Sequence, residues 1–385
     1  MSRLTDSNTP DGDSIVAPLV FHAPLRKGRG AVANVRGRFE VDQRVAFDDE
    51  WGGLAREAEE ADDIKLKTIV TAETAKTILS TNDSPDIPFR LSLNPYRGCE
   101  HGCIYCFAQP THSYLGLSPG LDFESRLFAK VNAAELLRRE LAKPSYTPDV
   151  IAVGVNTDAY QPIEREWKIT RAVLEVLYES RNPFGLITKS ALIERDLDLL
   201  APLAKEGLVR AAVTITTLDS DMARKLEPRA ASPARRLRTI RTLVEAGVPV
   251  SVSVSPVIPF ITDGEMEKIV EAAAEAGATN AHFIVLRLPW ELNNVFHQWL
   301  TAHFPLRVER VMNRIRDLRG GKDYDSHFGT RMTGVGIWAD LFSQRFRIAC
   351  NRHGLNRDRR GFDTSKFVRP VTAKGEAAQG NLFGR

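Results

Sequence analysis

Apolar and polar positions alternate in a regular way from residue 133 onward. Continuous apolar runs, typical of strands buried on both faces, cover residues 149–157, 184–190, 208–217, 248–260 and 281–289. Between them, apolar residues three and four positions apart predict helices over residues 133–143, 169–180, 193–206, 233–247, 263–277 and 291–304. The chain therefore repeats a strand–helix unit, which predicts a parallel sheet covered by helices.

The number of units narrows the choice of fold. A closed β/α barrel, a partial barrel and a doubly wound sheet all fit the alternation, but about six units favour a partial (β/α)6 barrel. We expect a core domain over residues 85–325, preceded by a largely irregular extension over residues 1–84. Residues 326–385 are expected to form a short helical segment and a disordered tail. In such barrels the chemistry takes place at the C-terminal ends of the strands.

Composition excludes several classes of protein. Hydrophobic residues make up 43% of the 385 residues, enough for a sizeable core, and no apolar run approaches the ~20 residues of a membrane span. The N-terminus lacks the pattern of an export signal, so we expect a cytoplasmic protein without membrane association. The net charge of +3 is too small to indicate nucleic-acid binding by itself. Residues 26–40 and 345–362 are locally basic, which suits either phosphate contacts or a solvated surface.

Three of the four cysteines lie within eight residues, in NPYRGCEHGCIYCFAQPTH (94–112). Cys99, Cys103 and Cys106 have the spacing C-x3-C-x2-C, whereas zinc sites usually combine two C-x2-C pairs. The fourth cysteine, Cys350, is remote in sequence. Three close thiolates suit a [4Fe–4S] cluster with one iron left open, as at a catalytic metal site. A zinc site or a purely structural site remains the alternative.

This motif, followed by Phe107 and by about six strand–helix units, resembles the radical S-adenosylmethionine superfamily over roughly residues 85–325. Further similar blocks resemble the spore photoproduct lyase-like branch and an uncharacterised bacterial subgroup within it; they are NTDAYQPIEREWKITR (156–171), ITKSALIERDLDLL (187–200), TTLDSDMARKLEPRAASPARRL (216–237) and VSPVIPFITD (254–263). The photoproduct lyases use a cysteine after the second strand as hydrogen donor. No cysteine lies between Cys106 and Cys350, so the same repair reaction is not expected.

The resemblance implies a cofactor pair and a type of reaction. In the superfamily, the open iron of the [4Fe–4S] cluster chelates S-adenosyl-L-methionine, and an electron from the cluster cleaves it to a 5′-deoxyadenosyl radical. That radical abstracts hydrogen from a substrate, which is unidentified here, with a nucleobase in DNA or RNA as one candidate. A reductant such as flavodoxin or ferredoxin is implied as partner. The alternative from another class is a nucleic-acid-binding protein whose cluster is structural or redox-sensing.

The resemblance also implies contacts to S-adenosylmethionine at the strand ends. It assigns the methionine amino group to Thr157 and Asp158, and the methionine carboxylate to Lys189, which a buried cation at a strand end would suit. Asp158 as a turn cap, and Lys189 in a structural ion pair with Asp158 or Glu194, are the alternatives. Ser190, directly after Lys189, is a further candidate contact.

The fourth predicted strand offers hydroxyl groups for the cofactor ribose. Thr214 and Thr216 lie two positions apart and are expected on one face of the strand. Because threonine is also an ordinary strand former, a purely structural role is an equal alternative.

Two features lie near the C-terminus. Cys350 is on a predicted amphipathic helix, where a buried apolar role is expected and hydrogen donation is the alternative. Gln379, Leu382 and Phe383 resemble the peptides that dock on the bacterial DNA sliding clamp, although a pattern of three residues also arises by chance. A clamp partner is therefore one expectation for the tail.

Overall fold

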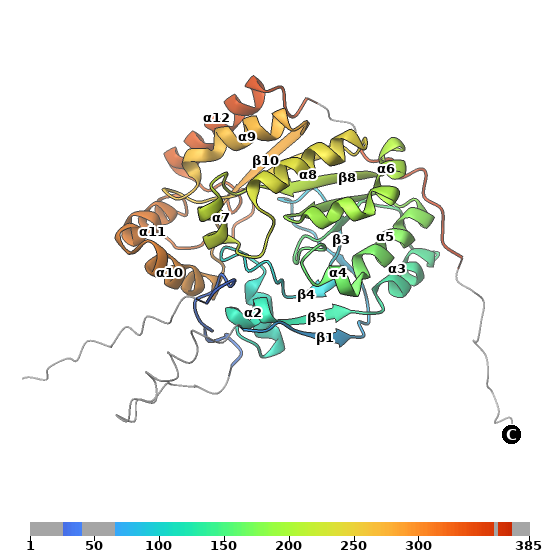
Figure 1. The fold of residues 1–385 in the computed structure, drawn as a ribbon, viewed down its shortest axis with the longest axis horizontal. Helices are drawn as coiled ribbons and strands as arrows, with labels where there is room; N and C mark the ends of the chain where they lie inside the picture. Colours follow the sequence, from blue (N-terminus) through green and yellow to red (C-terminus); the bar gives the residue numbers. More distant parts are fainter. Residues whose placement is uncertain (1–25, 41–65, 358–360, 372–385) are drawn as a thin grey trace, which may run out of the picture.

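The computed structural model describes residues 26–40, 66–357 and 361–371, and its main sheet has the strand order β10-β9-β8-β7-β6-β3-β2 (Figure 1). The parallel strands are β3 (Leu91–Leu93), β6 (Ile151–Val153), β7 (Phe184–Thr188), β8 (Val209–Thr214), β9 (Val250–Val257) and β10 (Asn280–Val285). β2 (Leu79–Thr81) pairs antiparallel with β3 at the edge. Since successive parallel strands are neighbours and the sheet does not close, the fold is the predicted partial (β/α)6 barrel.

Helices cover the outer face of this sheet. The six predicted helices are all present, as α3 (Ala133–Ala142), α5 (Ile169–Ser180), α6 (Leu197–Lys205), α8 (Pro233–Glu245), α9 (Met266–Glu275) and α10 (Leu292–His303). Further helices, outside the predicted ranges, are α2 (Leu121–Ser125), α4 (Glu164–Trp167), α7 (Ser220–Leu226) and α11 (Val308–Asp317). The 3-10 helices are η1 (Gln109–Leu115), η2 (Ala191–Asp196), η3 (Asp263–Glu265) and η4 (Pro305–Arg307).

The apolar strand residues and the inner helix faces form one continuous core. Val250, Val252 and Val254 alternate along β9 and are at most 2% exposed, while Leu174 and Leu177 bring α5 onto the sheet with no exposed area. Each such side chain contributes about 1.5–3 kcal/mol when it leaves water. The polar positions between the valines of β9 face the barrel interior, where the pocket described below lies.

A small second sheet joins the N-terminal extension to the core domain. β1 (Ile69–Glu73) pairs parallel with β5 (Arg126–Lys130), which pairs antiparallel with β4 (Tyr96–Arg97). β1 and β2 both lie in the range that was expected to be largely irregular. Residues 26–40 carry neither helix nor strand.

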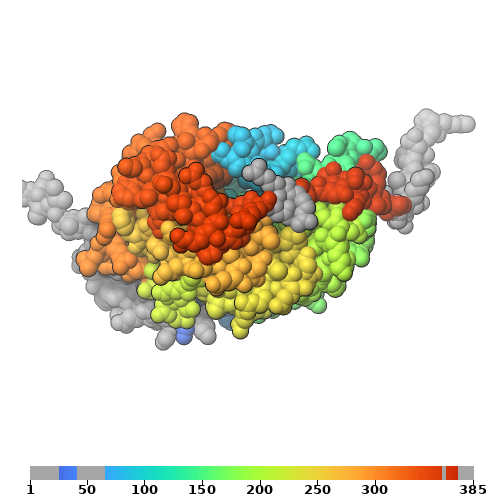
Figure 2. All heavy atoms as spheres, turned by 90° about the horizontal axis from the view of Figure 1, so that it is seen from above, coloured from blue at the N-terminus to red at the C-terminus, as the bar shows by residue number. Residues whose placement is uncertain are grey.

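The C-terminal part of the chain extends the shell of the barrel. α12 (Gly336–Arg352), in red in Figures 1 and 2, packs on α9 and on β10, where the rings of Phe346 and Phe283 are 4.8 Å apart. Residues 361–371 run along the ends of the helices that precede the strands; the Val368 N–H donates to the Ser180 carbonyl at 2.7 Å. Figure 2 also shows a hollow between the light-blue residues before β3 and the red C-terminal segment. No described helix is long and apolar enough to cross a membrane.

Candidate active site

The cysteine loop follows β4 and is fixed by backbone hydrogen bonds to distant segments. The Cys99 N–H donates to the Phe123 carbonyl at 2.9 Å, and the Ile104 N–H donates to the Leu226 carbonyl at 2.9 Å. The loop is therefore tied to α2 on one side and to the end of α7 on the other. These ties hold its backbone still, so its side chains occupy defined places.

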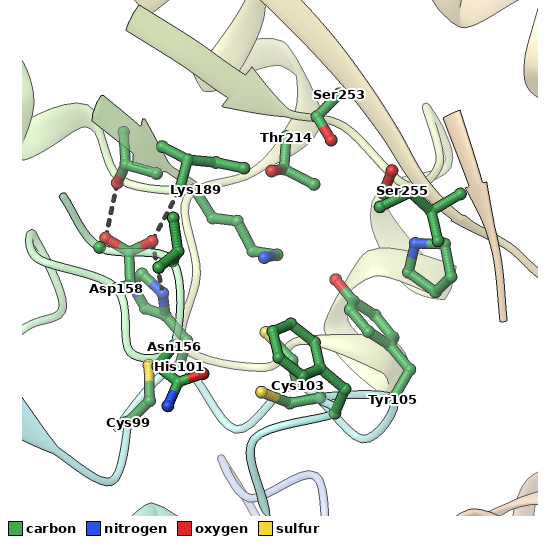
Figure 3. A pocket seen from close by; sticks show the side chains of 18 of the residues that line it. Cys99, His101, Cys103, Tyr105, Asn156, Asp158, Lys189, Thr214, Ser253 and Ser255 are labelled. Atoms are coloured by element: carbon green, nitrogen blue, oxygen red, sulfur yellow. Dashed lines mark hydrogen bonds and ion pairs between the residues drawn. The ribbon is translucent and has the colours of Figure 1, made fainter. Parts of the chain in front are cut away.

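The three thiols open into a pocket at the C-terminal ends of the strands (Figure 3). The lining side chains come from the cysteine loop, from the segment after β6, and from the ends of β7 to β10. The polar and titratable members are Cys99, His101, Cys103, Tyr105, Cys106, Asn156, Asp158, Thr188, Lys189, Thr214, Ser253, Ser255, His282 and Arg287. This is where parallel α/β folds carry their chemistry.

The arrangement of the cysteines fits a cluster better than a single metal ion. Among the described residues, no three His, Cys, Asp or Glu side chains lie close enough together to share one ion. Cys99 and Cys103 are each 8% exposed, and burial raises the pKa of Cys103 well above its usual range and that of Cys106 to about 11. Such thiols ionise only beside strong positive charge, which the irons of a multinuclear cluster supply.

Asp158 is the acidic residue of the pocket lining, and both of its carboxylate oxygens accept hydrogen bonds from the protein. Its Oδ1 accepts from the Thr188 hydroxyl at 2.7 Å, and its Oδ2 accepts from the Lys189 N–H at 2.8 Å. His101 Nδ1 lies 3.3 Å from Oδ2. Burial opposes both charges, but the pair outweighs it, lowering the pKa of Asp158 to about 2 and raising that of His101 to about 9. Asp158 also accepts from the Tyr160 N–H at 2.9 Å, as in the turn that the alternative reading predicted.

The side chain of Lys189 extends into the centre of the pocket in Figure 3. Its amino group has no hydrogen bond or ion pair with any described residue, and it lies 5.8 Å from the Tyr105 ring centroid. Burial by itself would lower the pKa of Lys189, but Cys103, Glu227 and Asp158 raise it above the usual value, so the group is an ammonium. Glu194, the other suggested partner, pairs instead with Arg235 at 2.6 Å.

The remaining predicted cofactor contacts are divided by their placement. Thr214, at the end of β8, lines the pocket. Asp158, after β6, and Lys189, after β7, line it as well. The Thr157 hydroxyl donates to the Tyr96 carbonyl at 3.0 Å, and the Ser190 hydroxyl accepts from the Leu192 N–H at 3.2 Å at the start of η2. Neither residue is part of the pocket lining. Their roles toward a cofactor stay predictions.

Thr216 belongs to a buried polar network beneath the pocket. Its hydroxyl is 3.1 Å from that of Tyr105, which also donates to Glu227. Arg236 Nη1 lies 2.7 Å from the Glu227 carboxylate, and both side chains are at most 1% exposed. Thr216 is therefore not on the pocket face with Thr214, because β8 ends at Thr214 and the alternation stops there.

A segment that the sequence analysis treated only as basic covers the cysteine loop. The Glu124 carboxylate, with no exposed area, accepts from the Gly30 and Ala31 N–H groups at 2.9 and 2.8 Å. Arg29 Nη1 donates to the Glu124 carbonyl at 2.6 Å. Burial raises the pKa of Glu124 to about 7 although these donors oppose it. We call residues 26–40 the strap.

Two further pocket residues, Ser253 and Ser255, were also missed. The serines alternate with valines in VSVSVSPV (250–257), and this period of two was a usable signal that one face of the strand is polar. Among the described residues, the buried Ser255 hydroxyl has no partner. It is free to bond a bound molecule.

Cys350 lies away from this site. It is 4% exposed in the main core on α12 and is not among the pocket residues. Burial raises its pKa to about 11. This is the environment expected of the buried apolar role. The suggested clamp-binding residues Gln379, Leu382 and Phe383 lie outside the described residues.

A partial (β/α)6 barrel with a three-cysteine loop opening into its strand-end pocket defines a class of enzymes that combine an iron–sulfur cluster with S-adenosylmethionine. The family model of the Radical SAM superfamily matches residues 93–273, and the chain belongs to this superfamily. The family implies a [4Fe–4S] cluster and S-adenosylmethionine as cofactors.

Similar proteins agree with this assignment. An uncharacterized protein of Mycobacterium tuberculosis is 38% identical over 232 residues, which are 60% of this chain and 68% of that protein. One of Methanocaldococcus jannaschii is 27% identical over 222 residues, 58% and 79% of the two chains. Among solved structures, spore photoproduct lyase complexed with dinucleoside spore photoproduct has a TM-score of 0.53 at 16% identity, covering 74% of this chain and 80% of that chain. The last likeness shows the fold.

Proposed function

We propose that Cys99, Cys103 and Cys106 hold a [4Fe–4S] cluster and that the enzyme abstracts hydrogen from a nucleobase in DNA or RNA. When bound and reduced, the cluster supplies the electron that cleaves S-adenosylmethionine. The observation that carries the proposal is the common opening of three thiols, those of Cys99 and Cys103 buried and that of Cys106 partly buried, and of the unpaired Lys189 ammonium group into a single strand-end pocket.

The chain's own residues bind and orient the cofactor in this proposal. The Lys189 ammonium holds the methionine carboxylate, because a buried cation without a protein partner gains most from a charged acceptor. Asp158 positions Lys189 through its backbone N–H at 2.8 Å. Thr214 offers a hydroxyl to the ribose from the end of β8. The strap and α2 cover the outer side of the cysteine loop and exclude water there.

The nucleobase substrate is supported by a structural neighbour. Spore photoproduct lyase, which has the same fold, is known complexed with dinucleoside spore photoproduct. This chain has no cysteine between Cys106 and Cys350, so we propose a nucleobase reaction without a cysteine hydrogen donor. An external reductant, flavodoxin or ferredoxin, completes the proposal.

The experiment is anaerobic. The protein is reconstituted with iron and sulfide, reduced with dithionite and mixed with S-adenosylmethionine, and 5′-deoxyadenosine is measured by mass spectrometry. We expect product from the wild type and none from Cys103→Ala, with Cys350→Ala as the matched cysteine control. A verified, reduced [4Fe–4S] cluster that yields no product would refute the radical reaction and favour the structural or redox-sensing alternative.

A further inference from the structure

Three arginine side chains gather beside the pocket, at the C-terminal end of β10. Arg287 lines the pocket directly, and Arg319 and Arg331 lie behind it. Their partners differ, and the difference indicates which of them is available to a bound molecule.

Arg319 is a structural residue. It is 3% exposed, and its guanidinium donates to four backbone carbonyls, those of Val285, Leu286, Thr330 and Arg331, at 2.8–3.3 Å. These bonds tie the segment around residue 330 to the end of β10. With its donors so occupied, Arg319 is committed to the fold.

Arg331 is committed as well. Its Nε lies 2.6 Å from the Asp86 carboxylate, and its Nη2 donates to the Ser84 hydroxyl. The same carboxylate accepts from the Gly329 N–H at 2.6 Å. The pair therefore fastens the residues before β3 to the segment after α11.

Arg287 has no such partner. No described residue forms a hydrogen bond or ion pair with its guanidinium, which instead stacks 4.8 Å from the ring centroid of Phe107. Burial, and then the nearby Arg331 charge, lower the pKa of Arg287. A partly buried guanidinium without an acceptor is costly, and an anion with two oxygens would remove that cost.

Phe107 supplies the second half of the subsite. It directly follows the last cysteine, lines the same pocket and is 43% exposed. An exposed aromatic face beside a guanidinium is the arrangement that single-stranded nucleic acids use, with a base on the ring and a phosphate on the cation. A carboxylate-bearing substrate would use the cation but leave the ring without a role.

We propose that Arg287 and Phe107 form a nucleotide subsite at the pocket mouth, in which Arg287 binds a backbone phosphate and Phe107 stacks on the adjacent base. The subsite rests on the proposed function, because it names how the nucleic-acid substrate is held.

The test is a binding measurement that needs no turnover. Fluorescence anisotropy of a short fluorescein-labelled oligothymidylate is titrated with the anaerobically reconstituted wild type and with Arg287→Ala, Arg287→Lys and Phe107→Leu. We expect Arg287→Ala to weaken binding by roughly 10-fold or more, the worth of a charge-assisted hydrogen bond. Arg287→Lys should recover only part, since an ammonium cannot pair with two oxygens at once. Arg139→Ala, an arginine 65% exposed on α3, is the matched control and should stay within about 2-fold of the wild type.

Competition identifies the phosphate. The dinucleotide thymidylyl-thymidine should displace the probe better than thymidine, and this advantage should vanish in Arg287→Ala. If the alanine variant does not fold, as judged by circular dichroism, the lysine variant carries the comparison.

Equal affinity of Arg287→Ala and the wild type, or no binding by the wild type, would overturn the subsite. S-adenosylmethionine affinity, measured by equilibrium dialysis, separates a third case: a comparable loss there would assign Arg287 to the cofactor and also overturn it. Because binding does not depend on cleavage, oligonucleotide binding without 5′-deoxyadenosine would refute the proposed reaction alone.

Discussion

The contact between the strap and the cysteine loop gives a sharp prediction for Gly30→Ala. A Cβ at residue 30 would lie 2.0 Å from the Gly102 carbonyl oxygen, whereas ordinary contact begins at 3.4 Å. The strap and the loop must therefore separate by about 1.4 Å, the difference between these two distances. Gly102 cannot yield easily, because a Cβ there would lie 2.8 Å from the Glu124 carboxylate, which shows how closely the three residues pack.

The cost has two parts. Overpacking costs about 1–3 kcal/mol, and weakening the bonds from the Gly30 and Ala31 N–H groups to the buried Glu124 adds about 1.5–3 kcal/mol. We expect a loss of about 2.5–6 kcal/mol in the free energy of unfolding, measured with urea. We also expect faster bleaching of the cluster's visible absorption in air, because the displaced strap admits water and oxygen.

Gly28→Ala is the matched control within the strap. Its Cβ would meet no atom within 4 Å, so the change costs only the strain of a φ of +77°, about 1–2 kcal/mol. If Gly30→Ala matched Gly28→Ala in stability and in bleaching rate, the strap would not be what holds the cysteine loop, and the reasoning would be refuted.

Two further predictions concern buried titratable groups. Burial raises the folded-state pKa of Glu124 to about 7, so its stabilising contribution is complete below about pH 4.5 and is lost as the pH rises through 7, by about 3 kcal/mol. Urea unfolding at about pH 5 and about pH 8 should therefore show a smaller decline in Glu124→Gln than in the wild type; equal declines would contradict the assignment. Cys350→Ala should retain 5′-deoxyadenosine formation and lose about 1 kcal/mol of stability for the removed sulfur, whereas a loss of product with the fold intact would contradict a purely structural role for Cys350.

The repeating part of the fold could be predicted because its signals are local. Buried strands and amphipathic helices each have a characteristic spacing of apolar residues that can be read within a short stretch of sequence. All six expected helices and the strands between them were confirmed. α11 was not predicted, although Val308, Val311, Met312 and Ile315 have the i, i+3, i+4, i+7 spacing of a buried helix face, so a local signal was present. In the strap, Gly30 and Ala31 bond to Glu124, which lies 94 and 93 positions further along the chain. No local sequence pattern predicts a contact over such a separation.

The candidate site was predictable in its residue types but not in the directions of its side chains. The spacing of the three cysteines indicated a shared cluster site, and the structure places all three in one pocket. The hydroxyl candidates were Thr157, Ser190, Thr214 and Thr216. Whether each of them faces the pocket depends on where its strand ends and on whether a nearby backbone carbonyl or N–H forms a hydrogen bond with its hydroxyl group. Such local bonds occupy Thr157 and Ser190, whereas Thr214 reaches the pocket.

Charge pairing around the pocket indicates how many anions it binds. Each acidic side chain at the pocket has a cationic partner. Asp158 lies beside His101, and Glu227, which is buried beneath the pocket, lies beside Arg236. The cations Lys189 and Arg287, in contrast, form no ion pair with an acidic side chain among the described residues. Unpaired, partly buried cations reduce stability, so a fold that keeps two of them gains something on binding. Lys189 extends into the centre of the pocket, whereas Arg287 lies against Phe107. We therefore expect a separate anionic group at each cation. Two anionic groups, one on the cofactor and one on the substrate, account for both cations.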